Sequence, residues 1–189
     1  MTPDLYLAAR PLIQPVDVIA FWGPRRNPIS GLIELVTDGG PSHVAVVRDG
    51  CHAGSDVTIV ESTIEGRRNG VQTNPLGGTL IGYPAGSRAK LYRLLPSVRT
   101  RVDLMGFYAC CGANDGIVHY DIGALFRFLL PDWITQMIWD PKVLRAEVCS
   151  VWVATALEAA HATCGVDPRR QKPSDVIAMP IFQPPVRIL

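Results

Sequence analysis

One helix with little polar surface constrains how this 189-residue chain can fold. In and just after the stretch 146–158, apolar side chains recur at the three-and-four spacing that turns one face of a helix toward a core. The other face carries mostly small residues, which predicts a helix that is buried nearly all round. The rest of the chain must therefore pack around it. The apolar positions are Val148, Val151, Trp152, Ala156 and Ala159.

Cys149 falls at or within about one turn of the start of this helix, because the residues just upstream are typical of irregular chain. The unpaired amide groups and the dipole at a helix start favour an anion there, and a thiolate is an anion. A cysteine in the middle of a helix would act only as a small hydrophobic side chain. Its position alone makes Cys149 a candidate nucleophile, which then needs a base.

Composition limits the class of protein. With 48% hydrophobic and 19% charged residues, the chain can bury a substantial core, and its length predicts a single domain spanning residues 1–189, with a core at about 16–178. The net charge of +1 gives no support for a nucleic acid or an anionic membrane as the main partner. The expected partner is a small peptide or acyl substrate, and the composition leaves the oligomeric state open.

Cysteine usage and the N-terminus suggest a compartment. The five cysteines form no Cys-x-x-Cys pair and no zinc-finger spacing, so we expect no structural metal, no cofactor, and free thiols in a reducing environment. The first residues lack the pattern of a signal peptide, and no run approaches the roughly 20 apolar residues of a membrane span. The sequence thus predicts a cytoplasmic protein without a transmembrane segment. The cysteines other than Cys149 are Cys51, Cys110, Cys111 and Cys164.

The order of elements predicts an α+β fold, with antiparallel strands in the middle and helices mostly after them. Short segments rich in β-branched residues predict strands, and apolar residues at helical spacing predict helices. A stretch rich in Gly, Asn and Pro predicts loops over 63–88, and the Pro-rich tail predicts extended chain on the surface. The expected strands are 16–22, 42–47, 57–62 and 90–95, and the expected helices are 28–37, 100–111, 120–130 and 148–159.

His43 is the histidine best placed to serve as the base. It occupies the first position of an otherwise apolar strand, where a polar ring needs a partner or a role. His161 lies about three turns along the Cys149 helix, too far from its start to reach the thiol. His52 lies in a turn-rich loop and His119 precedes a helix, so either is easily a solvated residue.

Strand pairing offers His43 a carboxylate in either of two registers. If Val47 faces Val57, then Glu61 stands opposite His43, and opposed residues lie on the same face with Cβ atoms roughly 5 Å apart. A tight two-residue turn between the strands puts Asp56 opposite His43 instead. The first register keeps the valines of both strands together on the reverse face and is therefore favoured. Either carboxylate could fix the tautomer of the imidazole.

These residues lie in segments whose order resembles the circularly permuted NlpC/P60 cysteine hydrolases. The bacterial YiiX-like proteins are the nearest group, and the lecithin:retinol acyltransferase-like proteins are more distant relatives. In these families the histidine strand precedes the cysteine helix, the reverse of papain. The resemblance extends from Asp17 to about Ile177, and Val151 stands where the family often has an acidic residue. The matching segments are Asp17–Gly23, Ser42–Val47, Val60–Ser62, Tyr120–Gly123 and Val148–Ser150.

The resemblance implies a permuted papain-like fold, with an antiparallel sheet or small barrel packed against helices, and a cysteine peptidase or amidase. Cys149 would be the nucleophile, His43 the base and Glu61 the residue that orients it. Tyr120 and Ser150 would contact the substrate, and the substrate would be a small peptide such as a cell-wall fragment. Two alternatives remain: an acyltransferase or lipid (thio)esterase that uses the apolar segment 122–139, and a binding module without turnover.

Overall fold

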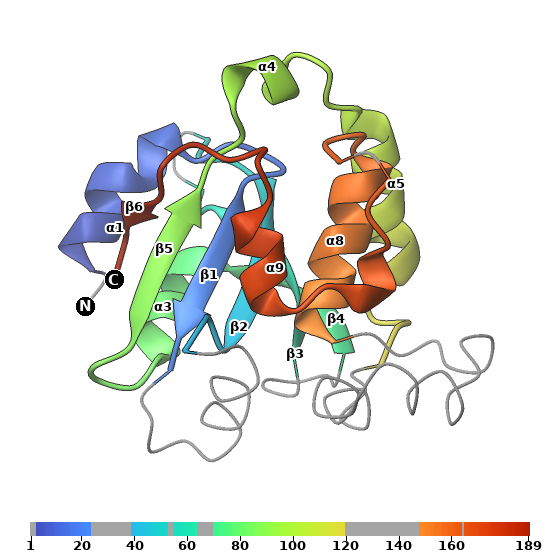
Figure 1. Ribbon diagram of the computed structural model, residues 1–189. Helices are drawn as coiled ribbons and strands as arrows, with labels where there is room; N and C mark the ends of the chain where they lie inside the picture. The colour runs from blue at the N-terminus through green and yellow to red at the C-terminus, as the bar shows by residue number, and fades with distance from the viewer. Residues whose placement is uncertain (1–2, 24–38, 53–54, 64–69, 120–147, 164) are drawn as a thin grey trace.

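A six-stranded antiparallel sheet, in the order β4-β3-β2-β1-β5-β6, forms the middle of the structure, a computed structural model (Figure 1). The structure describes residues 3–23, 39–52, 55–63, 70–119, 148–163 and 165–189. All five strand pairings within the described residues are antiparallel, as the order of elements predicted. The strands are β1 (Val18–Trp22), β2 (His43–Asp49), β3 (Thr58–Thr63), β4 (Gly70–Pro75), β5 (Arg88–Tyr92) and β6 (Val186–Arg187).

Helices cover both faces of this sheet. The α8 helix, with α5 and α9, packs on one face, and α1 and α3 pack on the other (Figure 1). The α+β class is confirmed, and the described elements form three layers, with the sheet between two layers of helices. The helices are α1 (Asp4–Ala9), η1 (Arg10–Leu12), α3 (Leu76–Gly82), α4 (Pro96–Arg99), α5 (Leu104–Asn114), α8 (Cys149–Ala159), η2 (Pro168–Arg170) and α9 (Pro173–Ala178).

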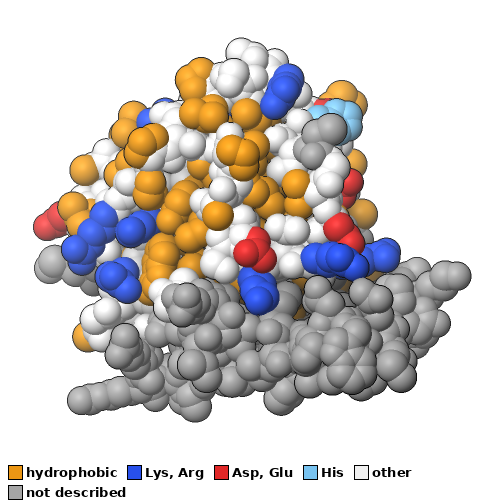
Figure 2. All heavy atoms as spheres, in the orientation of Figure 1, with side chains coloured by type: hydrophobic (Ala, Val, Ile, Leu, Met, Phe, Trp, Pro, Cys, Tyr) orange, Lys and Arg blue, Asp and Glu red, His pale blue; other side chains and the backbone are white. Residues whose placement is uncertain are grey.

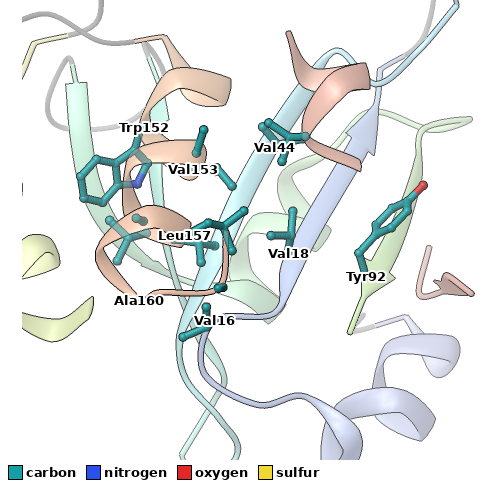
Figure 3. Packing of buried hydrophobic residues seen from close by; sticks show 14 of the residues in the cluster. Val16, Val18, Val44, Tyr92, Trp152, Val153, Leu157 and Ala160 are labelled. Carbon is teal, nitrogen blue, oxygen red and sulfur yellow. The ribbon is translucent and has the colours of Figure 1, made fainter. Parts of the chain in front are cut away.

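The predicted buried helix is α8, and it begins at Cys149. Eight of its eleven residues are buried, in accord with its apolar and small side chains. Figure 3 shows Val44 of β2 and Val18 of β1 pointing into the same cluster as Val153 and Leu157 of α8. Burying a side chain of this size contributes roughly 1.5–3 kcal/mol, so this layer holds α8 firmly on the sheet.

The opposite face of the sheet forms a second apolar layer. Alternate residues of the strands, such as Ile19 of β1 and Ile59 of β3, pack there against Tyr6 of α1 and Leu76 of α3. Alternation along a strand therefore separates the two cores, because successive side chains point to opposite faces. Every residue of β1 and the four residues 44–47 of β2 contribute to one core or the other, which explains why both strands are so apolar there.

The register of β2 on β3 differs from both predicted registers. Val47 lies opposite Ile59 rather than Val57, and a bulge between Val47 and Asp49 adds a residue to β2. Relative to the favoured register, β3 has shifted by two residues. A shift of two keeps every side chain on its predicted face, whereas a shift of one would have exchanged the faces. His43 and Glu61 therefore still share a face, as diagonal rather than direct neighbours.

The prediction of loops over 63–88 is wrong for most of that stretch. Residues 70–75 form the edge strand β4, and residues 76–82 form α3. The strand escaped notice because its side chains are mostly polar and Gly and Pro stand at its ends. Its backbone nonetheless has partners on both sides, β3 and the segment 116–118. Gly70 (φ +126°) allows this close approach, because a Cβ there would lie 1.9 Å from the carbonyl oxygen of Val118.

The Pro-rich tail is also more ordered than extended surface chain. Pro173 occupies the first turn of α9, and Asp175 accepts a hydrogen bond from the amide of Lys172, so the segment starts a helix. Val176 of α9 is fully buried against the α8 side of the sheet. The predicted helices at 28–37 and 120–130 lie outside the described residues. None of the helices described here is long and apolar enough to cross a membrane.

Candidate active site

His43 and Glu61 meet at the end of the sheet where β2 begins. The Nε2 atom of His43 lies 2.6 Å from Oε2 of Glu61, a short contact of the kind that charged partners make. Glu61 is 5% exposed, so its carboxylate depends on protein partners rather than on water. The predicted pairing of these two residues is therefore present, although the register that suggested it was wrong. Asp56 accepts hydrogen bonds from Tyr6 and from the amide of Gly77 instead.

Asn74 of β4 holds the other oxygen of the same carboxylate. Its Nδ2 atom donates to Oε1 of Glu61 at 2.8 Å. Both carboxylate oxygens are thus engaged, and the one that faces His43 cannot easily exchange with the other. Sequence reasoning missed Asn74 because the stretch that holds it was predicted as loop. The signal that could have found it is the spacing of Gln72 and Asn74, two polar residues that a strand places on one face.

Cys149 lies beside the His43 ring, at the first residue of α8. The Cys149 sulfur is near enough to the ring to raise the pKa of His43. Figure 1 shows that α8 starts at the end of the sheet where β1 finishes and β2 begins. His43 and Cys149 therefore meet because each is the first residue of its element. Since Nε2 of His43 faces Glu61, Nδ1 is the ring nitrogen left for the sulfur.

The charges around His43 favour its protonated form. Burial alone disfavours an imidazolium, but the Cys149 sulfur and the Glu61 carboxylate outweigh that effect and raise the pKa of His43 to about 10. Burial likewise opposes ionisation of Glu61, yet the hydrogen bond and charge of His43, with the Asn74 amide, lower the Glu61 pKa. The arrangement thus supports an imidazolium held between a carboxylate and a sulfur. This is the charge distribution that activates a thiol.

Aromatic packing limits how the His43 ring can turn. Phe21 lies opposite His43 in the β1–β2 register, and the two ring centroids are 5.7 Å apart. Phe21 is itself stacked on Tyr83, with centroids 4.7 Å apart and planes 9° from parallel. Ser42 adds to this support, because its hydroxyl donates to the carbonyl of Phe21 and accepts from the amide of Gly23.

The start of α8 supplies hydrogen-bond donors near the sulfur. Val148, the residue before the helix, is extended and provides no side-chain cap, so the first amides of α8 have no side chain bound to them from that position. Ser150 is fully buried, and within the described residues its hydroxyl has no hydrogen-bond partner. Ser150 was predicted to contact the substrate, and an unused buried hydroxyl beside the nucleophile is compatible with that role. Tyr120, the other predicted contact, lies outside the described residues.

The three other histidines, with Cys51 and Cys111, lie elsewhere in the described part of the chain. His52, His119 and His161 are exposed, and Cys51 is an exposed free thiol in the loop after β2. Cys111 is buried in the α5–α8 layer, where burial raises the pKa of its thiol to about 12 and so keeps it protonated. In the described part of the chain, His, Cys, Asp and Glu side chains form no group of three that could hold a metal ion.

Three predicted site residues, Cys149, His43 and Glu61, are thus brought together from three separate elements. Two of the elements, β2 and β3, are neighbours in the sheet, and α8 lies against both. The chain matches no known protein family and no curated protein by sequence.

Proposed function

We propose that the protein is a cysteine hydrolase that cleaves an amide bond through Cys149, His43 and Glu61. The observation that carries the proposal is the position of the His43 ring, between the Glu61 carboxylate at 2.6 Å and the sulfur at the start of α8. A nucleophile, a base within reach of it, and a third group that orients the base are the parts that covalent acyl transfer needs.

The chemistry runs in two halves. The Cys149 thiolate attacks the substrate carbonyl, the first amides of α8 stabilise the oxyanion, and the imidazolium of His43 gives its proton to the leaving amine as the C–N bond breaks. Neutral His43 then takes a proton from water, and the hydroxide attacks the thioester. The acid product leaves, and the thiolate and imidazolium are restored. Glu61 holds the ring in one orientation throughout.

The substrate and the finer fold follow from the resemblance to the permuted NlpC/P60 hydrolases. That resemblance supports a small peptide or a cell-wall-derived amide as substrate. It also supports a permuted papain-like fold, since the histidine strand precedes the cysteine helix along this chain. The competing lipid reaction relied on segment 122–139, which lies outside the described residues.

Selective alkylation tests the proposal without a known substrate. Iodoacetamide at mildly acidic pH is expected to label Cys149 faster than Cys51, although Cys51 is the exposed thiol and Cys149 is 2% exposed. Peptide mapping by mass spectrometry gives both rates in one sample. His43→Ala is expected to remove the preference for Cys149, while His52→Ala, which changes an exposed histidine, leaves it intact. Equal rates at the two cysteines in the native protein would refute the proposal.

Substrate panels separate the two chemistries and test for an inactive module. Dipeptide amides and short-chain acyl esters are each incubated with the protein, and intact mass reveals any acyl adduct on Cys149. Cleavage of the amides supports the hydrolase proposed here. Cleavage of esters alone favours the lipid reaction. A protein whose Cys149 is reactive but never acylated by either class would be a binding module.

A further inference from the structure

Two cations, Arg88 and Lys90, lie near the Trp22 ring on the α8 side of the sheet, and a third, Arg187, is paired with Lys90. Trp22 lies opposite Arg88 in the β1–β5 register, and Lys90 lies opposite Arg187 in the β5–β6 register. Directly paired residues share a face, so all four side chains project to the same side. Trp22 belongs to the apolar cluster that contains Cys149, which places this side of the sheet with α8. We call Trp22, Arg88, Lys90 and Arg187 the basic face.

The basic face has charge that the fold leaves unused. The Lys90 ammonium lies 5.3 Å from the centroid of the Trp22 ring, and the Arg88 guanidinium lies 5.8 Å from it. A cation over an aromatic ring keeps its N–H groups free to bind elsewhere. Among the described residues, neither Arg88 nor Lys90 pairs with a carboxylate, whereas Arg187 donates a hydrogen bond from Nε to the main-chain oxygen of Leu189 at 2.8 Å. Figure 2 shows Lys and Arg side chains gathered over β5 and β6, beside a stripe of apolar surface.

The basic face is close to the reacting sulfur. Trp22 is the last residue of β1 and belongs to the same apolar cluster as Cys149. Neighbouring strands lie about 4.8 Å apart, so the backbone of Arg88 is about 10 Å from the start of β2. An extended peptide spans about 3.3–3.6 Å per residue, so that distance is about three residues. A substrate bound at Cys149 can therefore reach the basic face with a group close to its scissile bond.

We propose that the basic face binds an anionic group of the substrate, a carboxylate within about three residues of the bond that Cys149 cleaves. Guanidinium and ammonium groups bind carboxylates with charge-assisted hydrogen bonds, and the indole beside them offers an apolar surface for the adjoining carbon chain. The inference rests on the proposed function, because it takes Cys149 as the reacting atom. It adds to that function a substrate class, an acidic peptide rather than a neutral one.

A matched pair of alkylating reagents tests the charge preference. Iodoacetate is an anion and iodoacetamide is neutral, and both alkylate the same sulfur. The ratio of their rate constants at Cys149 is expected to fall about two- to fivefold at low ionic strength in Arg88→Gln/Lys90→Gln, and less at high salt. Arg88→Glu is expected to lower the ratio as well. Arg101→Gln, which removes an exposed charge beyond α4, serves as the control and leaves the ratio unchanged.

The outcomes distinguish the two proposals. An unchanged ratio, at a Cys149 that still reacts quickly with iodoacetamide, overturns the basic face and leaves the hydrolase intact. If Cys149 of the native protein reacts no faster than Cys51 with either reagent, the hydrolase is overturned and this inference with it. The iodoacetamide rate of each variant shows whether the site itself was disturbed.

A matched pair of substrates then tests the proposed class directly. Two dipeptide amides that differ only by Glu or Gln before the scissile bond are compared in the native protein and the double variant. The KM of the Glu substrate is expected to rise about tenfold with kcat unchanged, because the interaction is the same in the ground state and the transition state. The KM of the Gln substrate stays the same. Equal changes for both substrates would refute a charge-specific role.

Discussion

Two buried carboxylates occupy opposite ends of this fold and serve different purposes. Asp17, just before β1, is fully buried and binds Arg99 together with the amides of Leu94 and Gln14. Glu61, in β3, is almost as deeply buried, and its hydrogen bonds within the described residues are to the side chains of His43 and Asn74. The first connects backbone segments far apart in the sequence, and the second connects groups that can react.

The partners of the two carboxylates decide what each can do. Arg99 keeps its charge at any pH that proteins tolerate, whereas His43 can release its proton. Burial dominates at Asp17 and raises the pKa of that carboxyl despite Arg99, while His43 and Asn74 lower the pKa of Glu61. A carboxylate with a permanently charged partner is suited to hold the chain together. One whose partner titrates is suited to proton transfer.

Removing Asp17 should give the largest effect, and that effect should be on stability. Asp17→Ala leaves the Arg99 charge and the Leu94 amide without their partner, which costs about 3 kcal/mol. Arg99 is 24% exposed and can turn toward water, which keeps the cost from being larger. Urea denaturation measures the loss, with Asp4→Ala, which changes an exposed acid on α1, as control. An equal loss in both variants would contradict a structural role for Asp17.

Replacing Glu61 should reverse this balance. In Glu61→Gln we expect the rate of Cys149 alkylation or amide cleavage to fall about 100-fold, or about 2.7 kcal/mol, because no carboxylate then fixes the tautomer and orientation of His43. The free energy of unfolding should fall by only about 1 kcal/mol, because His43 keeps its contact with Cys149 and can also lose its proton. Kinetics and denaturation on the same sample check this split. A loss of stability as large as that of Asp17→Ala would contradict the distinction between a structural role for Asp17 and a role in the reaction for Glu61.

Replacing Asn74 should have a smaller effect than replacing Glu61, because Asn74 acts through the Glu61 carboxylate. Asn74→Ala removes one hydrogen bond to the carboxylate, so we expect the rate to fall about tenfold with the KM unchanged. Asn74→Gln keeps an amide and tests whether reach as well as chemistry is needed. Thr79→Ala, which removes an exposed hydroxyl on the adjacent α3, is the control. Full activity in Asn74→Ala would show that Asn74 contributes only to the structure of β4 and not to the reaction.

The pH dependence of stability offers the finest comparison. The His43 pKa is raised from its ordinary 6.5 to about 10, so its contribution to stability is complete below about pH 6.5 and disappears as the pH rises to 10. The Glu61 pKa is lowered, so its contribution is present above its ordinary 4.5 and disappears in acid. Denaturant midpoints measured from about pH 2 to about pH 10 should show both losses in the native protein and in Asp17→Ala. In Glu61→Gln, the free energy of unfolding should depend less on pH in both the acid and the alkaline range.

Much of the site could be predicted from the sequence because three signals are local. The spacing around Trp152 predicted α8, its start placed Cys149, and the apolar run of β2 made His43 stand out. The alternation of a strand then put Glu61 on the correct face even though the register was off by two. Face is determined by parity alone, which survives an even shift.

The missed features depend on tertiary contacts. The bulge after Val47 has no local sequence signal, and it displaced the register. The β4 strand is polar and gains its stability from hydrogen bonds to β3 and the segment 116–118, so a pattern based on hydrophobic residues could not identify it. Asn74 was lost together with β4. The basic face escaped notice because Trp22, Arg88 and Arg187 are separated by many residues and meet only through strand pairing.

The ends of the sheet bear on how this protein behaves at high concentration. Exposed strand edges act as templates on which other chains can add and aggregate. Here one outer strand, β6, has only two residues. The other, β4, spends the amide and carbonyl of Val71 on the segment 116–118 and finishes at a proline. Within the described residues, neither border of the sheet leaves a long unpaired ladder, so these two edges present little opportunity for fibril growth in the native state.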